Sequence, residues 1–226
     1  MSDLTPELLL LAYASGIFPM ADDREASVVQ WIDPHHRGII PLHHYHVPRS
    51  LKKVIRQRRF QIRADTAFAS VITACAECQP DRPRTWLNDE LITLYCTLHE
   101  MGYAHSVEAW SDDRLVGGVY GISLGGAFFG ESMFSRARDA SKVALIDLIE
   151  RLNRGGYLLL DTQFVTDHLM RFGAVEIPRE AYLRQLKQAL EREAEFYSDA
   201  GVIVSSTPWP LKSELVGSSQ STTQTS

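Results

Sequence analysis

The sequence predicts an α+β fold built around an antiparallel meander. Three apolar segments between residues 105 and 131 are separated by short polar or glycine-rich turns, which is typical of antiparallel strands. A helical pattern starts near Asp139 and ends at Gly155, before the apolar strand 157–160 and a further helix at 166–172. Because a strand at 60–64 and two helices precede the meander, strands and helices do not alternate as they do in a parallel α/β protein.

Residues that favour helix ends mark the other helices. Thr5 is suited to cap the first helix and Gly16 to end it. Asp65 is expected to open a helix that runs to about residue 77. Asn88 is expected to cap the following helix, which Gly102 ends.

These elements divide the chain into three predicted parts. Residues 1–59 form a small N-terminal α/β unit that ends in a basic helix, with residues 31–48 in loops and short extended pieces. Residues 60–207 form the larger domain, which closes with a helix at 179–195. Residues 208–226 form a disordered tail, since the Ser, Thr and Gln near its end have little apolar surface to bury. The order of elements in the larger domain resembles the GCN5-related N-acetyltransferase architecture, so we expect an acetyltransferase-like catalytic domain there.

The charge of the chain is strongly segregated. The 226 residues carry a net charge of −5, which argues against coating nucleic acid through bulk charge. Residues 49–63 nevertheless contain no acidic residue and seven basic ones: Arg49, Lys52, Lys53, Arg56, Arg58, Arg59 and Arg63. Such a segment can hold a double-stranded nucleic acid by its phosphates without reading sequence. The alternative is an amphipathic helix whose basic face is simply solvated.

A second candidate phosphate site lies at the start of the helix near Asp139. Ser135, Arg136, Arg138 and Lys142 surround this helix N-terminus, where free backbone N–H groups favour an anion. In acetyltransferase-like folds the acyl donor places its phosphates here. The glycine-rich turn that wraps the pyrophosphate of coenzyme A is absent, so we expect a donor with a different phosphate group, such as the 3′ end of a charged tRNA.

Other functional classes have weaker support. Cys75 and Cys78 are spaced like half a zinc site, but Cys75 falls on an apolar helix face and is expected to be a buried thiol. The histidines at 43, 44 and 46 lack neighbouring ligands at recognised spacing, so no metal site is predicted. Because no apolar stretch approaches the ~20 residues of a membrane helix and the start lacks a basic signal-peptide region, we expect a cytoplasmic protein.

From about residue 8 to residue 186, the chain resembles the leucyl/phenylalanyl-tRNA–protein transferases. The matching motifs occur in order at residues 11–20, 31–37, 85–86, 99–108, 115–121, 129–136, 140–142, 160–163 and 168–169. The resemblance implies an aminoacyltransferase that moves Leu, Phe and, less well, Met from aminoacyl-tRNA to proteins with N-terminal Lys or Arg. It further implies that the products enter the bacterial N-degron route of degradation, and that aminoacyl-tRNA is a co-substrate with no separate cofactor.

The resemblance also implies which residues form the site. The walls of an apolar pocket for the donor side chain are expected to include Trp86 and Tyr95, with Met20, Val119, Met133 and Ser135 nearby; the alternative for Tyr95 is a core residue. The tRNA is expected to contact Arg49, Lys52, Lys53, Arg56, Arg136 and Lys142. In the family Trp is common at the position of Met20, and Ser at that of Asp33, so the pocket is expected to differ in shape.

Asp161 and Gln163 follow the apolar strand and are expected to be the catalytic residues. Because they are two residues apart, a regular strand would point both side chains to the same face. We expect Gln163 to accept a hydrogen bond from the incoming amine, and Asp161 to orient Gln163. By the same resemblance, Glu131 is expected to meet the amine or the basic acceptor residue. The alternative is that Asp161 and Gln163 form only a polar strand end, satisfied by neighbouring backbone groups, without a catalytic role.

Two other functions fit parts of the pattern. An acyl-coenzyme A N-acetyltransferase fits the fold order, and a non-catalytic tRNA-binding module fits the basic segment alone. Since a fold does not determine function, the chemistry of the site must decide between them.

Overall fold

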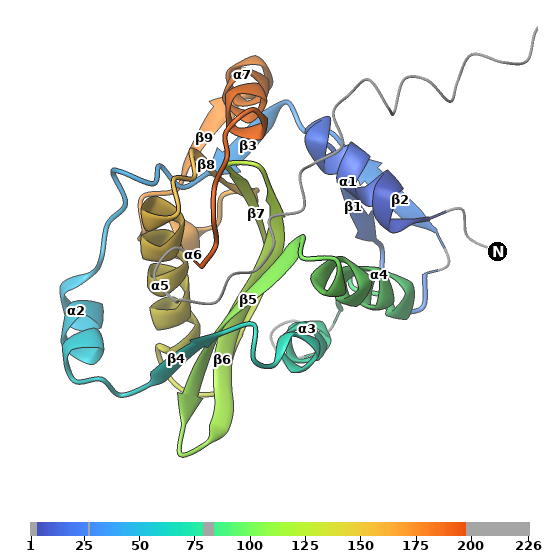
Figure 1. The fold of residues 1–226 in the computed structure, drawn as a ribbon. Helices are drawn as coiled ribbons and strands as arrows, with labels where there is room; N and C mark the ends of the chain where they lie inside the picture. The colour runs from blue at the N-terminus through green and yellow to red at the C-terminus, as the bar shows by residue number, and fades with distance from the viewer. Residues whose placement is uncertain (1–3, 27, 79–83, 198–226) are drawn as a thin grey trace, which may run out of the picture.

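The computed structural model describes residues 4–26, 28–78 and 84–197, and its main feature is a seven-stranded sheet (Figure 1). In spatial order the strands are β4 (Gln61–Ala64), β5 (Ala104–Ser111), β6 (Arg114–Leu124), β7 (Ala127–Ser135), β8 (Leu159–Gln163), β3 (His36–Ile39) and β9 (Val175–Pro178). Neighbouring strands are antiparallel except β7 and β8, which are parallel. The predicted α+β class and the central meander are confirmed.

The N-terminal part contributes a separate hairpin and one strand of the large sheet. Strands β1 (Phe18–Ala21) and β2 (Val29–Ile32) pair with each other beside helix α1 (Pro6–Ala14). Strand β3 lies within residues 31–48, where we expected loops with short extended pieces, and it pairs with both β8 and β9. The segment 1–59 and the following part of the chain therefore share one sheet.

Helices cover both faces of the large sheet (Figure 1). On one face α5 (Ala140–Arg154) packs against the meander, and α2 (Arg49–Arg56) packs on α5. On the other face lie α1, α3 (Phe68–Ala76), α4 (Asp89–Glu100) and α7 (Arg179–Leu190), whose buried side chains form one apolar cluster. The short helix α6 (Asp167–Met170) follows β8. In the described part of the chain, none of these helices is long and apolar enough to span a membrane.

The predicted helix caps are largely confirmed. The side-chain oxygen of Thr5 accepts a hydrogen bond from the N–H of Leu8, and that of Asn88 accepts one from Leu91. Gly16 and Gly102 have the positive φ angles that allow the chain to turn away after a helix. The thiol of Cys75 is fully buried, as expected.

Three predicted boundaries were wrong. Asp65 does not open α3, because its carboxylate accepts hydrogen bonds from the Ser106 N–H and the His105 ring, and the helix begins at Phe68. Helix α7 ends at Leu190, and not near residue 195, because the chain turns there and packs back on Gly155. The strand expected at 157–160 is shifted and runs from Leu159 to Gln163. The predicted tail, 208–226, lies outside the described residues.

A buried ion pair fixes β3 against β8. The guanidinium of Arg37 donates to both carboxylate oxygens of Asp161 at 2.7 to 3.1 Å, and both side chains are at most 1% exposed. Arg37 also donates to the Gly16 carbonyl at 2.9 Å, and its guanidinium lies 4.5 and 4.7 Å from the ring centroids of Phe18 and Tyr182. Burial alone would lower the pKa of Arg37, but Asp161 more than offsets this and raises it.

We expect Arg37→Met to cost on the order of 3–5 kcal/mol of unfolding free energy, because the buried Asp161 carboxylate would lose its partner. Urea unfolding of the two proteins measures this loss. Arg179→Met is a matched control, since Arg179 also contacts an aspartate, Asp33, at 2.6 Å but on the surface. The control should lose much less stability. Equal losses in the two variants would contradict a special role for the buried pair.

Candidate active site

The parallel strands β7 and β8 separate after a short stretch of pairing. Their ladder runs from Ala127 paired with Leu159 to Phe129 paired with Asp161. Glu131 on β7 and Gln163 on β8 each lie two residues beyond its last pair. The residues that follow the ladder on both strands line a cavity.

This cavity has a volume of about 380 Å³ and a mainly apolar lining. Six residues predicted for the site line it: Met20, Trp86, Val119, Glu131, Met133 and Gln163. Met20 comes from the hairpin strand β1, while Val119 and Met133 are paired neighbours on β6 and β7. Elements far apart in the sequence thus build an apolar space with a carboxyl and an amide on its wall.

Three predicted residues are not among those that line the cavity. Tyr95 is fully buried, and its ring lies against the ring of Trp86 at 6.4 Å between centroids, so the alternative of a core residue describes its place. Asp161 is fully buried beneath Arg37 and Tyr182. The Ser135 hydroxyl donates to the Ala137 carbonyl and accepts from the Ser141 N–H, so it supports the start of α5.

The strand end that carries Gln163 is irregular. Gly38 pairs with Gln163 and the next residue, Ile39, pairs with Asp161, which leaves Thr162 as an extra residue in a β-bulge. The Phe164 N–H donates to the Thr162 carbonyl at 2.6 Å, which closes a three-residue turn around Gln163. Gln163 has a φ of 57°, a conformation that costs of order 1–3 kcal/mol in a residue other than glycine.

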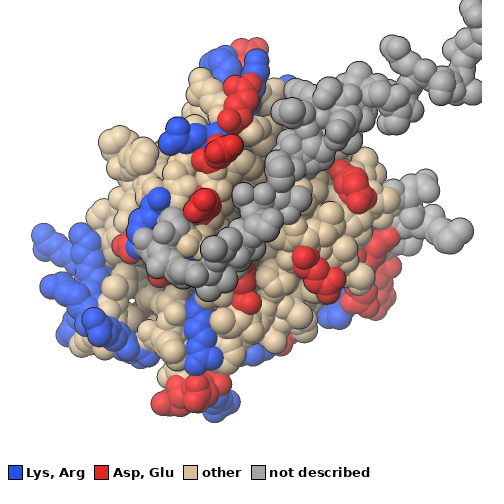
Figure 2. Space-filling view, in the orientation of Figure 1, with Lys and Arg blue, Asp and Glu red and all other residues tan. Residues whose placement is uncertain are grey.

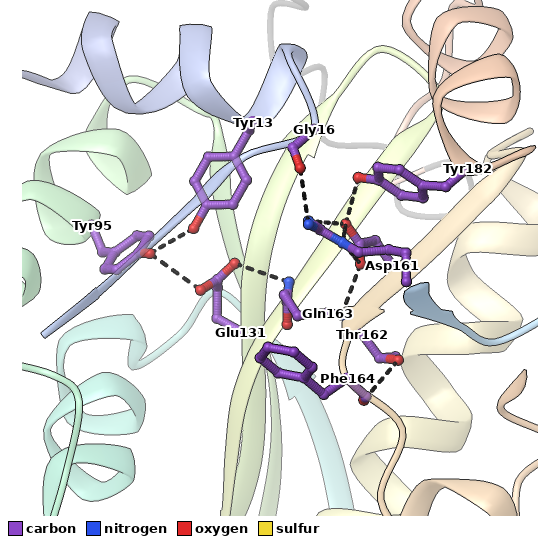
Figure 3. A network of polar contacts seen from close by, with 10 residues as sticks. Tyr13, Gly16, Tyr95, Glu131, Asp161, Thr162, Gln163, Phe164 and Tyr182 are labelled. Atoms are coloured by element: carbon purple, nitrogen blue, oxygen red, sulfur yellow. Dashed lines mark hydrogen bonds and ion pairs between the residues drawn. The ribbon is translucent and has the colours of Figure 1, made fainter. Parts of the chain in front are cut away.

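The expected relation between Asp161 and Gln163 was therefore wrong in its geometry. The bulge interrupts the regular alternation that this expectation assumed. One Asp161 oxygen accepts the backbone N–H of Gln163 at 2.8 Å, so Asp161 contacts the main chain of Gln163 and not its amide. The side-chain amide of Gln163 donates instead to Glu131 Oε1 at 3.4 Å (Figure 3).

Glu131 has the most perturbed carboxyl group near the cavity. Burial raises its pKa from an ordinary 4.5 to about 8, while hydrogen bonds from Tyr13 and Tyr95 partly oppose this shift. The nearby charge of Asp161 raises the pKa further, and the positive charge of Arg37 lowers it. A carboxyl with this pKa changes protonation near neutral pH, which is the range in which a group transfers protons most efficiently.

The predicted phosphate site at the start of α5 holds paired charges. The Lys142 ammonium contacts Asp139 at 2.7 Å, and the Arg136 guanidinium contacts Glu77 at 2.5 Å. Lys142 also acts on His168, which lines the cavity and whose pKa is lowered by burial first and by this positive charge second. The positive charge of Lys142 therefore acts on a residue of the cavity, although acidic partners partly neutralise the basic residues at the start of α5.

Helix α2 forms as expected and presents its basic residues to solvent. Leu51 and Val54 are buried on its inner side, whereas Arg49, Lys52, Lys53 and Arg56 are exposed. Figure 2 shows Lys and Arg gathered over this part of the molecule, at the left of the view. Arg63, which belongs to the same basic segment, lies on β4 and pairs with Asp113 at 3.0 Å.

Arg37, Tyr13 and Tyr182 belong to the site, but the sequence did not single them out. Arg37 stands in a matching motif directly before an apolar run, which is a weak signal for a buried cation. Tyr13 lies on the apolar side of α1 and Tyr182 on that of α7, where a tyrosine is indistinguishable from any core aromatic. Among the described residues, no group of three or more His, Cys, Asp or Glu is placed to hold a metal ion.

Comparison with known proteins gives a consistent result along the chain. Residues 39–187 match the family Leucyl/phenylalanyl-tRNA protein transferase, and residues 2–35 match the N-terminal domain of that family. A protein of this name from Paramagnetospirillum magneticum is 56% identical over 202 residues, which are 89% of this chain and 97% of the relative. One from Phenylobacterium zucineum is 56% identical over 198 residues, covering 88% and 90% of the two chains. One from Zymomonas mobilis is 57% identical over 187 residues, which are 83% of this chain and 70% of the relative. The chain that forms this cavity therefore belongs to the leucyl/phenylalanyl-tRNA–protein transferase family.

Proposed function

We propose that this transferase moves Leu, Phe and, less well, Met from aminoacyl-tRNA to proteins whose first residue is Lys or Arg. The observation that carries the proposal is the apolar cavity with Glu131 and Gln163 on its wall, at the point where β7 and β8 separate. An apolar side chain fits such a lining, and the two polar groups supply hydrogen-bonding partners beside it. The modified proteins would enter N-degron degradation.

The reaction is the aminolysis of an ester. The nitrogen of the acceptor α-amine attacks the ester carbonyl carbon, the bond from that carbon to the ribose oxygen breaks, and one proton moves from nitrogen to the ribose oxygen. Because an aminoacyl ester is already activated, positioning the two reactants supplies much of the rate, and no cofactor is required. Aminoacyl-tRNA is made and used in the cytoplasm, so we place the activity there.

Gln163 is suited to hold the amine. Its Nε2 donates toward Glu131, which leaves its carbonyl oxygen to accept a hydrogen bond from an incoming N–H group. Asp161 holds the backbone of Gln163 in place and is itself held by Arg37. Asp161 is therefore a positioning residue, and Gln163 is the group we assign to the substrate. Glu131 adds a carboxyl that faces the amine or the basic acceptor side chain.

The cavity lining supports a preference among donors. Met20, Trp86, Val119 and Met133 supply flexible or flat apolar surfaces, which suit Leu, Met and Phe better than a β-branched side chain. The separation of two parallel strands beside the cavity supports an acetyltransferase-like arrangement. In that arrangement Arg136 and Lys142 lie toward the phosphates, and exposed α2 holds the acceptor stem.

A transfer assay separates this proposal from its alternatives. The full chain is mixed with a peptide that begins with Arg and with radiolabelled Leu-tRNA, Phe-tRNA, Val-tRNA or acetyl-coenzyme A. We expect label in the peptide from Leu-tRNA and Phe-tRNA, little from Val-tRNA, and at least a hundredfold lower rate with Gln163→Ala, because loss of an orienting contact misplaces the amine.

Other outcomes of this assay would contradict the proposal. Label from acetyl-coenzyme A would favour an acetyltransferase, and retention of tRNA without transfer would favour a binding module. A Gln163→Ala rate near that of the parent would refute the role of Gln163. A peptide that begins with a neutral residue is the acceptor control.

Helix α2 gives a separate prediction. Replacing Lys52, Lys53 and Arg56 with Ala should weaken binding of every tRNA to a similar degree, because phosphate contacts carry no sequence information. The slope of log affinity against log salt concentration should also become shallower by about two to three units, as fewer counterions are released. Filter binding with tRNAs of different anticodons measures both effects. Selective loss for one tRNA would contradict this role.

A further inference from the structure

Two tyrosines behind the cavity bring their hydroxyl groups together. Tyr13 comes from α1 and Tyr95 from α4, and both are completely buried. Their oxygen atoms lie 2.6 Å apart, and the Tyr95 hydroxyl donates to Glu131 Oε2 at 3.1 Å (Figure 3). Buried hydroxyls usually find a partner, but here the partners form a chain that ends on a carboxyl group at the cavity.

Tyr95 is placed to donate to Oε2 of Glu131, and Tyr13 also acts on the carboxyl group as a hydrogen-bond donor. Each hydroxyl has one proton, so the short contact between the tyrosines is donated by the one that is not donating to Glu131. Glu131 Oε1 accepts from the Gln163 amide, so both oxygens of the carboxyl group are held. The rotation of the Glu131 side chain is thereby restricted from two sides.

We propose that Tyr13 and Tyr95 are positioning residues for the transfer reaction, holding Glu131 as the group that takes the proton from the acceptor's α-amine. This inference rests on the proposed function. When the carbon–nitrogen bond forms, the Glu131 carboxylate accepts the proton that leaves nitrogen. The proton then passes to the ribose oxygen as the carbon–oxygen bond breaks, and Glu131 returns to its carboxylate form.

Neighbouring groups determine when Glu131 is ionised. From the elements packed around it, the groups that face or electrically influence Glu131 are Tyr13 (α1), Tyr95 (α4), Tyr120 (β6), Arg37 (β3), Asp161 and Gln163 (β8) and Tyr182 (α7). A carboxylate whose pKa is raised to about 8 is a stronger base than an ordinary carboxylate, so it is better suited to take the proton that leaves nitrogen.

The two tyrosines favour the ionised form of Glu131. Both hydroxyls lower the pKa of Glu131, because hydrogen bonds donated to a carboxylate favour its charged form. Removing either hydroxyl raises that pKa further. Since the carboxylate is the active form and exists above the pKa, the activity of such a variant would be lost at a higher pH as the solution is acidified.

The test compares Tyr13→Phe and Tyr95→Phe with a matched control, Tyr120→Phe. Tyr120 is also fully buried, and its ring lies 5.7 Å from that of Tyr95, but within the described residues its hydroxyl has no hydrogen-bond partner. For each full-length protein, kcat and KM for Leu-tRNA are measured with the same Arg-peptide from about pH 6 to about pH 9.

In Tyr13→Phe and Tyr95→Phe we expect kcat to fall on acidification at a pH that is higher by about half to one unit than in the parent. This corresponds to a roughly three- to tenfold lower rate near neutral pH, with a much smaller difference at high pH and KM within about twofold. Tyr120→Phe should keep the parent profile. An equal loss at every pH would indicate a merely structural role and overturn the inference.

Glu131→Gln separates this inference from the proposed function. If the Glu131→Gln variant keeps the parent rate and the parent loss of rate at low pH, Glu131 has no part in the reaction. The role proposed for Glu131 is then wrong. If the rate of the Glu131→Gln variant no longer falls at low pH while both tyrosine variants keep the parent pH profile, only the inference about the tyrosines is overturned. A carbon-13 NMR titration of the Glu131 carboxyl gives a second readout independent of catalysis, and its pKa should rise in both tyrosine variants.

Discussion

The ion pair between Arg37 and Asp161 joins four parts of the molecule that are distant in sequence. Arg37 belongs to β3 and Asp161 to β8, while the Gly16 carbonyl follows α1 and the Tyr182 hydroxyl comes from α7. A carboxylate buried to this degree would be strongly destabilising without such partners. The contacts therefore hold the N-terminal hairpin, the sheet and the last helix in one arrangement around the cavity.

This arrangement explains why the cavity needs the N-terminal elements α1 and β1 as well as strand β8. The β1 strand supplies Met20 to the cavity, and α1 supplies Tyr13 to the hydroxyl chain behind Glu131. On the other side, Asp161 holds the backbone of Gln163, whose strained turn directs the amide toward Glu131. The groups that line the cavity are thus held by buried residues, such as Tyr13 and Asp161, that do not line it.

Local patterns in the sequence predicted the elements that are stabilised locally. The meander, the caps at Thr5 and Asn88 and the basic helix α2 depend on turn residues, periodicity and charge, all of which are visible in the chain. Strand β9 and the place of β3 in the large sheet were missed, because each strand has four residues and is stabilised by pairing with distant partners. The bulge at Thr162 was missed for the same reason, so a regular strand was expected where Asp161 in fact holds the backbone of Gln163 and not its amide. The resemblance to a family identified six of the residues that line the cavity, but no pattern distinguished the buried roles of Arg37 and Tyr13.

In the proposed reaction the ester of the donor lies between the ends of β7 and β8. A crystal structure with a hydrolysis-resistant amide analogue of leucyl-adenosine would show whether it does. We expect the leucyl side chain in the apolar cavity, beside Trp86 and Met133, and the acyl carbonyl within about 4 Å of the Gln163 amide. An analogue bound with its carbonyl away from both Gln163 and Glu131 would contradict this placement of the ester.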